Sequence, residues 1–198
     1  MISRRHFISA TSAAAALAGL APGVAANPSP NPDPSRADTR LDRLVNRIDP
    51  TIALWNPHTD ERLQLRFFGA AGYDREALRK INWLLRDWRE NEMAEIDARL
   101  LWALAALRQA GMQEGNAGLI HAHSGYRTLK TNEYLRRKGY RTARHSFHLR
   151  ARAVDFTMPG APVASLARYA QWLQIGGTGH YRNNFVHIDS GGSRRWTG

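Results

Sequence analysis

Apolar residues recur at every second position in two neighbouring stretches of the first half of the chain. Ile52 and Leu54 are in phase in the first stretch, and Leu63, Leu65 and Phe67 in the second. A period of two places such side chains on one face of a strand. The polar sequence NPHTDE lies between the stretches, so we expect a β-hairpin.

Two longer stretches that follow have helical spacing. The first covers residues 74–91, with Asp74 as its N-cap and Leu78, Ile81 and Leu85 on one face. The second covers residues 95–111 and is expected to end at Gly111. The tryptophans of both helices are expected in the core, the usual place for large aromatic side chains.

Short elements alternate in the second half. Residues 118–127 indicate a strand running into a turn, residues 131–139 a short helix, and residues 162–174 a helix begun by Pro162. Glycines separate two short strands between residues 175 and 196. A hairpin, then helices, then helices mixed with strands predicts an α+β domain.

The first forty residues differ in character from the rest. Arg4 and Arg5 precede an Ala-rich apolar run, so residues 1–26 are expected to be a signal peptide of the twin-arginine type. An uncleaved anchor helix is the alternative. Residues 27–40 contain a proline at every second or third position and predict an extended linker. The domain is then residues 41–198, and we expect a periplasmic monomer without a membrane segment after signal removal.

The amino-acid composition limits which binding partners and which kinds of catalysis are possible. The chain has no cysteine, which excludes disulfides and thiolate catalysis. It carries 28 Lys and Arg against 17 Asp and Glu, a balance that suits a polyanion. The basic residues are scattered and follow no nucleic-acid-binding motif. For an exported protein we therefore expect the anionic cell wall as partner, and no nucleic acid.

Candidate chemistry is concentrated in the second half, where all but one of the histidines after the expected signal peptide lie. His187 and Asp189 share one face of a strand, and Asp155 lies inside an apolar one. Two such strands could complete a zinc site with His148, since zinc binds imidazole nitrogens and carboxylate oxygens. The alternatives are that Asp155 pairs with a nearby arginine and that His187 is a satisfied core histidine.

Three segments resemble a known family. SFHLRARAVD (146–155) resembles the S-x-H-x-x-G-x-A-x-D signature of zinc peptidases with the hedgehog/DD-peptidase fold. GGTGHYRNNFVHIDSG (176–191) and SGYRTLKTNEYLRRKG (124–139) are similar to segments of its murein endopeptidase K-like branch, in peptidase family M15. The resemblance covers most of residues 50–197. It implies a small antiparallel sheet packed with helices, and Zn²⁺ as cofactor.

Carried over to this sequence, the resemblance implies His148, Asp155 and His187 as the zinc ligands. It also implies that Arg127 and Ser146 bind substrate. For the catalytic base the residues themselves offer two candidates. These are Asp189, two residues after His187 on the same face, and His180.

Two positions depart from the pattern of the relatives. The glycine of the signature is Ala151 here, which adds a methyl group near the backbone. Many relatives have a glutamate base three residues before the last histidine, where this chain has Asn184, although the resembling branch also lacks that glutamate. His121 and His123 are a further pair, and could be ligands, line the substrate site or be surface residues.

The resemblance implies a zinc endopeptidase that hydrolyses the peptide cross-links between peptidoglycan stem peptides. One alternative is a zinc-containing wall-binding domain without activity, because Asn184 and Ala151 depart from the catalytic pattern. A D,D- or L,D-carboxypeptidase acting on stem peptides is the other.

Overall fold

The computed structural model describes residues 38–182 and 184–198. The expected signal peptide (1–26) and residues 27–37 of the expected linker lie outside these residues. Within them, no helix combines the length and the apolar character that crossing a bilayer requires.

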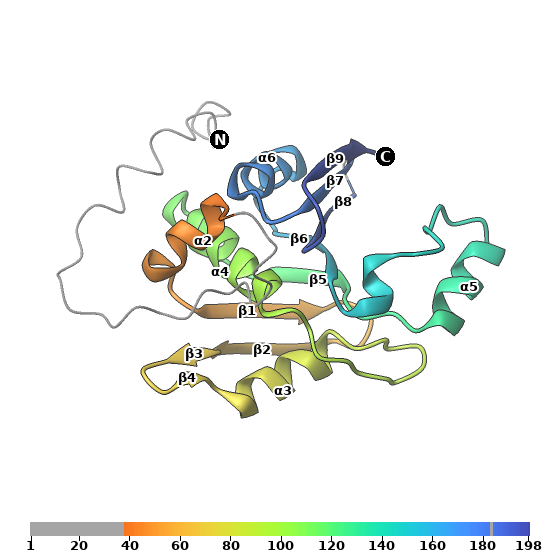
Figure 1. Cartoon of the computed structure of the whole chain (residues 1–198), viewed down its shortest axis with the longest axis horizontal. Helices are drawn as coiled ribbons and strands as arrows, with labels where there is room; N and C mark the ends of the chain where they lie inside the picture. Colours follow the sequence, from red (N-terminus) through yellow and green to blue (C-terminus); the bar gives the residue numbers. More distant parts are fainter. Residues whose placement is uncertain (1–37, 183) are drawn as a thin grey trace.

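A seven-stranded sheet with the order β2-β1-β5-β6-β8-β7-β9 forms the centre of the domain (Figure 1). Its strands are β1 (Thr51–Asn56), β2 (Glu61–Arg66), β5 (Ile120–Ser124), β6 (Ala153–Thr157), β7 (Gly177–Tyr181), β8 (Phe185–Asp189) and β9 (Arg194–Thr197). A separate two-stranded ribbon is formed by β3 (Phe68–Gly69) and β4 (Gly72–Tyr73).

The expected combination of helices with a sheet and the hairpin of β1 and β2 are confirmed, but the expected small antiparallel sheet is wrong. The sheet is large, and it is mixed because β1 pairs with β5 and β7 with β9 in parallel. Parallel neighbours need a crossover connection. Between β2 and β5 the chain forms two helices, which bring β5 back beside β1 in the same direction.

The helices are α2 (Arg40–Leu44), α3 (Arg75–Leu84), α4 (Ala98–Gln113), α5 (Leu129–Arg137) and α6 (Val163–Leu173), with 3-10 turns η2 (Val45–Arg47) and η3 (Phe147–Arg150). Asp74 caps α3 as expected, since its side chain accepts hydrogen bonds from the Glu76 and Ala77 amides. Pro162 precedes α6, also as expected.

Two helix ends differ from the expectation. Helix α3 ends at Leu84. The residues after it turn away from the helix, and the Asp87 carboxylate there accepts hydrogen bonds from the backbone amide and the hydroxyl of Thr128. Helix α4 continues past Gly111. A Cβ at Gly111 would lie 2.5 Å from Met158 Sδ, so this glycine permits close packing and does not end the helix.

One face of the sheet carries the hydrophobic core. Helices α2, α4 and α6 lie together on this side, and α4 is buried along most of its length (Figure 1). Trp102 on α4 is fully buried against Phe67 and Phe68, as expected. The expectation fails for Trp83, which is 41% exposed, and for Trp88, which is half-buried. The opposite face of the sheet is left for polar side chains.

A buried ion pair fixes α2 to this helical layer. Arg99 on α4 donates to the Asp42 carboxylate and to the Ile175 carbonyl oxygen. Burial alone would raise the pKa of Asp42, but hydrogen bonds from Thr39 and Arg99 outweigh it and lower the pKa. This carboxylate therefore stabilises the fold above its unfolded pKa, and the contribution is lost as the pH falls through its folded pKa.

We predict that Asp42→Ala lowers the free energy of unfolding by about 2–3 kcal/mol, because it leaves a buried guanidinium without its counter-charge. Denaturant unfolding at pH 7 measures the loss. Arg79→Ala, which removes an exposed ion pair with Glu76, is the control and should leave the unfolding midpoint near wild type. An equal effect of the two variants would contradict the prediction.

Candidate metal centre

The three predicted ligands meet on the polar face of the sheet. Asp155 on β6 lies directly opposite His187 on β8 in the antiparallel register, and His148 lies on η3 just before β6. All three residues are buried, and one donor atom from each lies within 4.8 Å of the others. The Asp155 Oδ1 atom is 2.7 Å from His187 Nδ1, and Oδ2 is 3.3 Å from His148 Nε2.

The far side of the His148 ring is fixed by the backbone. Its Nδ1 lies 2.7 Å from the Gly125 carbonyl oxygen, so Nδ1 carries the proton and Nε2 points to the cluster with a free lone pair. Gly125 itself requires glycine, because a Cβ would lie 2.3 Å from the Leu85 carbonyl oxygen. The close approach of this segment therefore sets the orientation of a ligand.

The His187 ring is fixed from behind by Asp189. His187 Nε2 donates to Asp189 Oδ2 at 3.1 Å, which leaves Nδ1 to face Asp155 and His148. Asp189 is fully buried and also accepts hydrogen bonds from Arg194 and from the amides of Gly177 and Gly191. The two rings thus offer different nitrogens, Nε2 of His148 and Nδ1 of His187.

The pKa values of the three residues are set by burial and by contacts within the cluster. Burial alone would raise the pKa of Asp155, but its contacts with His148 and His187 hold the pKa well below its ordinary range. Burial alone would lower the pKa of His187, yet its hydrogen bonds to Asp155 and Asp189 raise it to about 9. Burial keeps the pKa of His148 lowered, so that this ring is neutral.

The donor set fits a divalent metal ion. Two imidazole nitrogens and one carboxylate oxygen converge, and the second nitrogen of each ring is held by a carbonyl or carboxylate group. Metal-binding histidines commonly have their non-ligating ring nitrogen hydrogen-bonded in this way. Arg152 is directed toward Ser190 and Asp97, away from Asp155. The predicted ligands can therefore bind a metal ion together.

Arg127 lies beside the cluster, 3.8 Å from Asp155 Oδ2. Hydrogen bonds to Ser124 and Asn132 hold its guanidinium in place. Ser146 precedes η3, and its hydroxyl accepts a hydrogen bond from the His148 amide. The structure thus brings Arg127 to the triad and places Ser146 where it supports the His148 backbone.

The two predicted bases are placed differently. Asp189 reaches the triad only through the His187 ring. His180 pairs with Val186 on β8, and the fully buried Val186 belongs to the opposite, helix-covered face. The structure therefore does not bring His180 to the triad. Asn184 is exposed in the turn between β7 and β8.

Ala151 occupies a special backbone position directly after η3. Its φ is +53°, in the left-handed region, and it is almost fully buried. A glycine adopts this conformation without steric cost, whereas other residues are strained by roughly 1–2 kcal/mol. This explains why a glycine was expected here. Alanine has the smallest side chain among the residues that bear this strain.

Sequence reasoning missed several residues that build the site. Gly125 contacts His148, Arg194 donates to Asp189 behind His187, and the Trp196 ring lies 5.3 Å from that of His187. A Cβ at Gly179 would lie 2.7 Å from the Trp196 ring, so Gly179 makes room for it. These residues lie in the SGYR segment and in the glycine-rich C-terminal segment, both of which resemble the family. The sequence does not reveal which atoms they contact.

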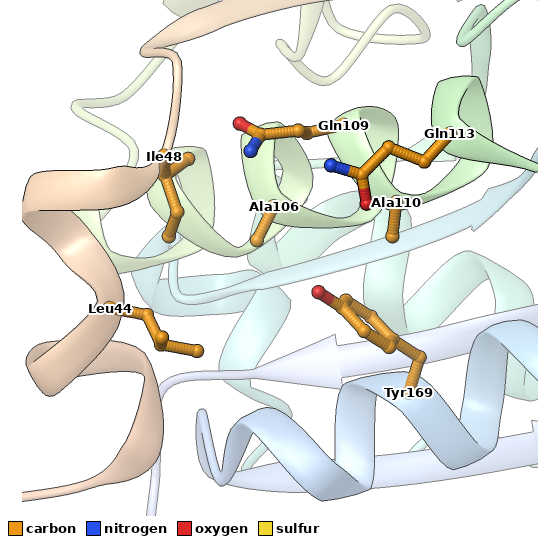
Figure 2. A pocket seen from close by; sticks show the side chains of 7 residues that line it. All are labelled: Leu44, Ile48, Ala106, Gln109, Ala110, Gln113 and Tyr169. Carbon is orange, nitrogen blue, oxygen red and sulfur yellow. The ribbon is translucent and has the colours of Figure 1, made fainter. Parts of the chain in front are cut away.

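A separate pocket lies in the helical layer, away from the triad (Figure 2). Its lining consists of Leu44, Ile48, Ala106, Gln109, Ala110, Gln113 and Tyr169. The only titratable group among them is the Tyr169 hydroxyl, and burial raises its pKa to about 12. This pocket therefore provides no acid or base near neutral pH.

The mixed α/β fold and the buried His-Asp-His group, which could hold a metal ion, are the arrangement expected of a metal-dependent enzyme. The chain belongs to peptidase family M15, in the branch whose family model is described as peptidoglycan L,D-endopeptidase MepK. That model matches residues 47–196.

Three curated relatives are similar over most of their length. The peptidoglycan L,D-endopeptidases MepK of Escherichia coli K12 and Shigella flexneri are 37% identical over 146 residues, 73% of this chain and 79% of theirs. The "Probable peptidoglycan L,D-endopeptidase MepK" of Haemophilus influenzae is 33% identical over 145 residues, 72% of this chain and 76% of its own. No solved structure shows significant similarity to the chain.

We predict that Asp189→Ala lowers the affinity for Zn²⁺ by about 10–100-fold, because His187 loses the group that fixes its ring. Titration with a zinc-competing dye measures the affinity. His180→Ala, on the other face of the sheet, is the matched control and should keep wild-type affinity. Unchanged affinity in Asp189→Ala would contradict the role of this hydrogen bond.

The strained position after η3 gives a second prediction. Ala151→Gly should retain or slightly raise the thermal midpoint, because relief of about 1 kcal/mol of strain offsets the loss of one buried methyl group. Ala151→Val should lower stability by more than about 2 kcal/mol, since a β-branched side chain is disfavoured at positive φ and has no space there. The reverse order of stabilities would show that the strain is not significant.

Proposed function

We propose that the chain is an exported zinc endopeptidase that hydrolyses peptide cross-links of peptidoglycan, at a bond between an L- and a D-residue. The observation that carries this proposal is the convergence of His148 Nε2, His187 Nδ1 and the Asp155 carboxylate at one buried point. Membership of the M15 family, and the peptidoglycan L,D-endopeptidase activity for which the relatives are named, support this substrate.

Hydrogen bonds from neighbouring groups hold the candidate ligand residues in place. His148 and His187 lie on either side of Asp155, and each ring is held from behind. A zinc ion bound there supplies Lewis acidity toward a peptide carbonyl oxygen and toward the attacking water. Because the ligands belong to β6, β8 and the turn before β6, the sheet limits their movement.

Arg127 is suited to bind a carboxylate or carbonyl group of the substrate. Its guanidinium has five N–H donors in a planar fork, and the hydrogen bonds to Ser124 and Asn132 leave others available. Its position beside Asp155 brings such a group next to the metal ligands. Stem peptides carry free carboxylates, so this residue can orient the substrate.

The sequence suggested Asp189 as the base that accepts the proton from water. We propose instead that Asp189 orients His187. Its Oδ2 accepts from His187 and Arg194, and its Oδ1 accepts from two backbone amides and from Arg194. The carboxylate is fully buried and lies behind the ring. A catalytic base must come within about 3 Å of the proton it removes, or reach it through one water.

Export fits the sequence of the first 26 residues, with its paired arginines and apolar run, and places the enzyme in the periplasm. The strongly basic composition favours adsorption to an anionic wall polymer, which salt would weaken. In this proposal the enzyme reaches its substrate already concentrated near the wall.

The test is incubation of the zinc-loaded protein with purified L,D- and D,D-cross-linked muropeptide dimers, followed by liquid chromatography and mass spectrometry. We expect uncross-linked products from the L,D-linked dimer, and their loss after treatment with a chelator. Asp155→Asn and His148→Ala each remove a proposed metal ligand. Each should therefore reduce the rate by more than the roughly 100-fold that is typical when only a hydrogen-bond partner of a ligand is lost.

His145→Ala is the matched control for His148→Ala, because His145 lies exposed in the same loop and should retain activity. Release of a terminal D-alanine alone would indicate the carboxypeptidase alternative. If the wild-type protein binds one zinc ion per chain and yields no product, the non-catalytic wall-binding alternative is correct.

A further inference from the structure

The strand register places a second set of side chains on the face that carries the metal ligands. Arg62 on β2 pairs with Trp55 on β1, Trp55 with His121 on β5, and His121 with Thr157 on β6. Thr157 is two residues from Asp155, and therefore on the same face. Arg62, Trp55 and His121 contact one another in this order, since the Arg62 guanidinium lies 5.1 Å from the Trp55 ring centre and the His121 ring centre lies 4.3 Å from it.

A second stack with the same chemistry adjoins this row. The His58 ring is stacked on Trp88 with 4.7 Å between the ring centres, and the Arg89 guanidinium lies 4.1 Å from the Trp88 ring. His58 Nε2 lies 3.1 Å from the backbone carbonyl oxygen of His123, which connects this stack to β5. His123 in turn contacts the Thr157 hydroxyl through Nε2, at 2.9 Å.

We call these two sets the aromatic strip, which consists of Arg62, Trp55, His121, His58, Trp88 and Arg89. Its tryptophans are only half-buried, and its arginines are exposed. The Trp55 ring is held in place by a hydrogen bond from its Nε1 to Asp60 Oδ1, at 2.8 Å. Ordered, partly exposed aromatic rings beside a reactive centre are typical of a binding surface.

We propose that the aromatic strip binds one peptide arm of the cross-linked substrate, an acidic peptide with short side chains. The proposal rests on the endopeptidase function proposed above. The ring faces of Trp55 and Trp88 would contact methyl and methylene groups of the peptide. Arg62 and Arg89 would bind its free carboxylates.

The distance from the strip to the metal ligands suits such an arm. Trp55 lies two strands from β6, about 10 Å away at the usual strand spacing, and the paired Thr157 is about 6.6 Å along β6 from Asp155. The separation is therefore about 12 Å. An extended peptide covers this with about four residues, the size of a stem peptide.

Two variants test the strip, Trp55→Ala and Arg62→Gln. With the L,D-cross-linked dimer we expect KM to rise about tenfold in Trp55→Ala and roughly threefold in Arg62→Gln, with kcat near wild type, because neither residue contacts the reacting bond. A second readout does not need turnover. The affinity of the metal-free protein for the soluble stem tetrapeptide, measured by isothermal titration calorimetry, should fall by similar factors.

The carboxylate contact has its own readout. Wild-type protein should bind the free-acid tetrapeptide more tightly than a tetrapeptide whose carboxylates are amidated. The double variant Arg62→Gln/Arg89→Gln should lose this preference. Arg40→Gln is the matched control, because Arg40 on α2 lies 4.6 Å from the ring of Trp172 on α6, the same kind of pair in the helical layer.

Unchanged KM and unchanged tetrapeptide affinity in both strip variants would overturn the proposal, as would a failure of wild-type protein to bind the tetrapeptide. The fold of Trp55→Ala is checked by its thermal midpoint, and Arg62→Gln changes only a surface side chain. If wild-type protein cuts no cross-link but the strip variants lose tetrapeptide binding, the endopeptidase function fails and the binding site is retained.

Discussion

The buried carboxylate of Asp155 is the constraint on which the rest of the site depends. A carboxylate inside a central strand is strongly unfavourable unless charged and hydrogen-bonding groups surround it. Here the neighbouring strand supplies His187, the preceding turn supplies His148, and Arg127 lies on the third side. The arrangement that compensates this burial is the same one that can hold a metal ion. Folding stability and function are therefore linked at one residue.

The hydrogen-bond partners of His148 and His187 connect the site to distant parts of the fold. His148 relies on the Gly125 carbonyl oxygen, and Gly125 is where the chain packs against Leu85. His187 relies on Asp189, which receives Arg194 from the C-terminal strand β9. Segments far apart in sequence thus orient two rings that lie side by side. The left-handed turn at Ala151 adds the change of direction that places His148 before β6.

The sheet separates two tasks between its faces. The helix-covered face carries the apolar core, which holds the strands in register. The other face uses that register to align polar and aromatic side chains from β2 to β9, with the metal ligands near the middle. Precise geometry is easier to maintain on central strands than on loops. An aromatic strip on one side and Trp196 on the other then flank a rigid centre.

The sequence by itself determined the local elements and indicated the candidate metal ligands. The period-two pattern gave the β1–β2 hairpin, the Asp74 cap gave the start of α3, and three motifs indicated His148, Asp155 and His187. Local signals suffice there, because caps, turns and alternation act within a few residues. The same signals failed at Gly111, which permits contact with Met158 and does not end a helix.

Only the tertiary structure decided the mixed seven-stranded sheet, the nitrogen that each histidine presents and the position of Asp189 behind His187. It also placed Trp55 on the face of the sheet that carries Asp155 and His187. These features depend on strand pairings and hydrogen bonds between distant residues, and spacing along the chain does not encode which atoms will meet.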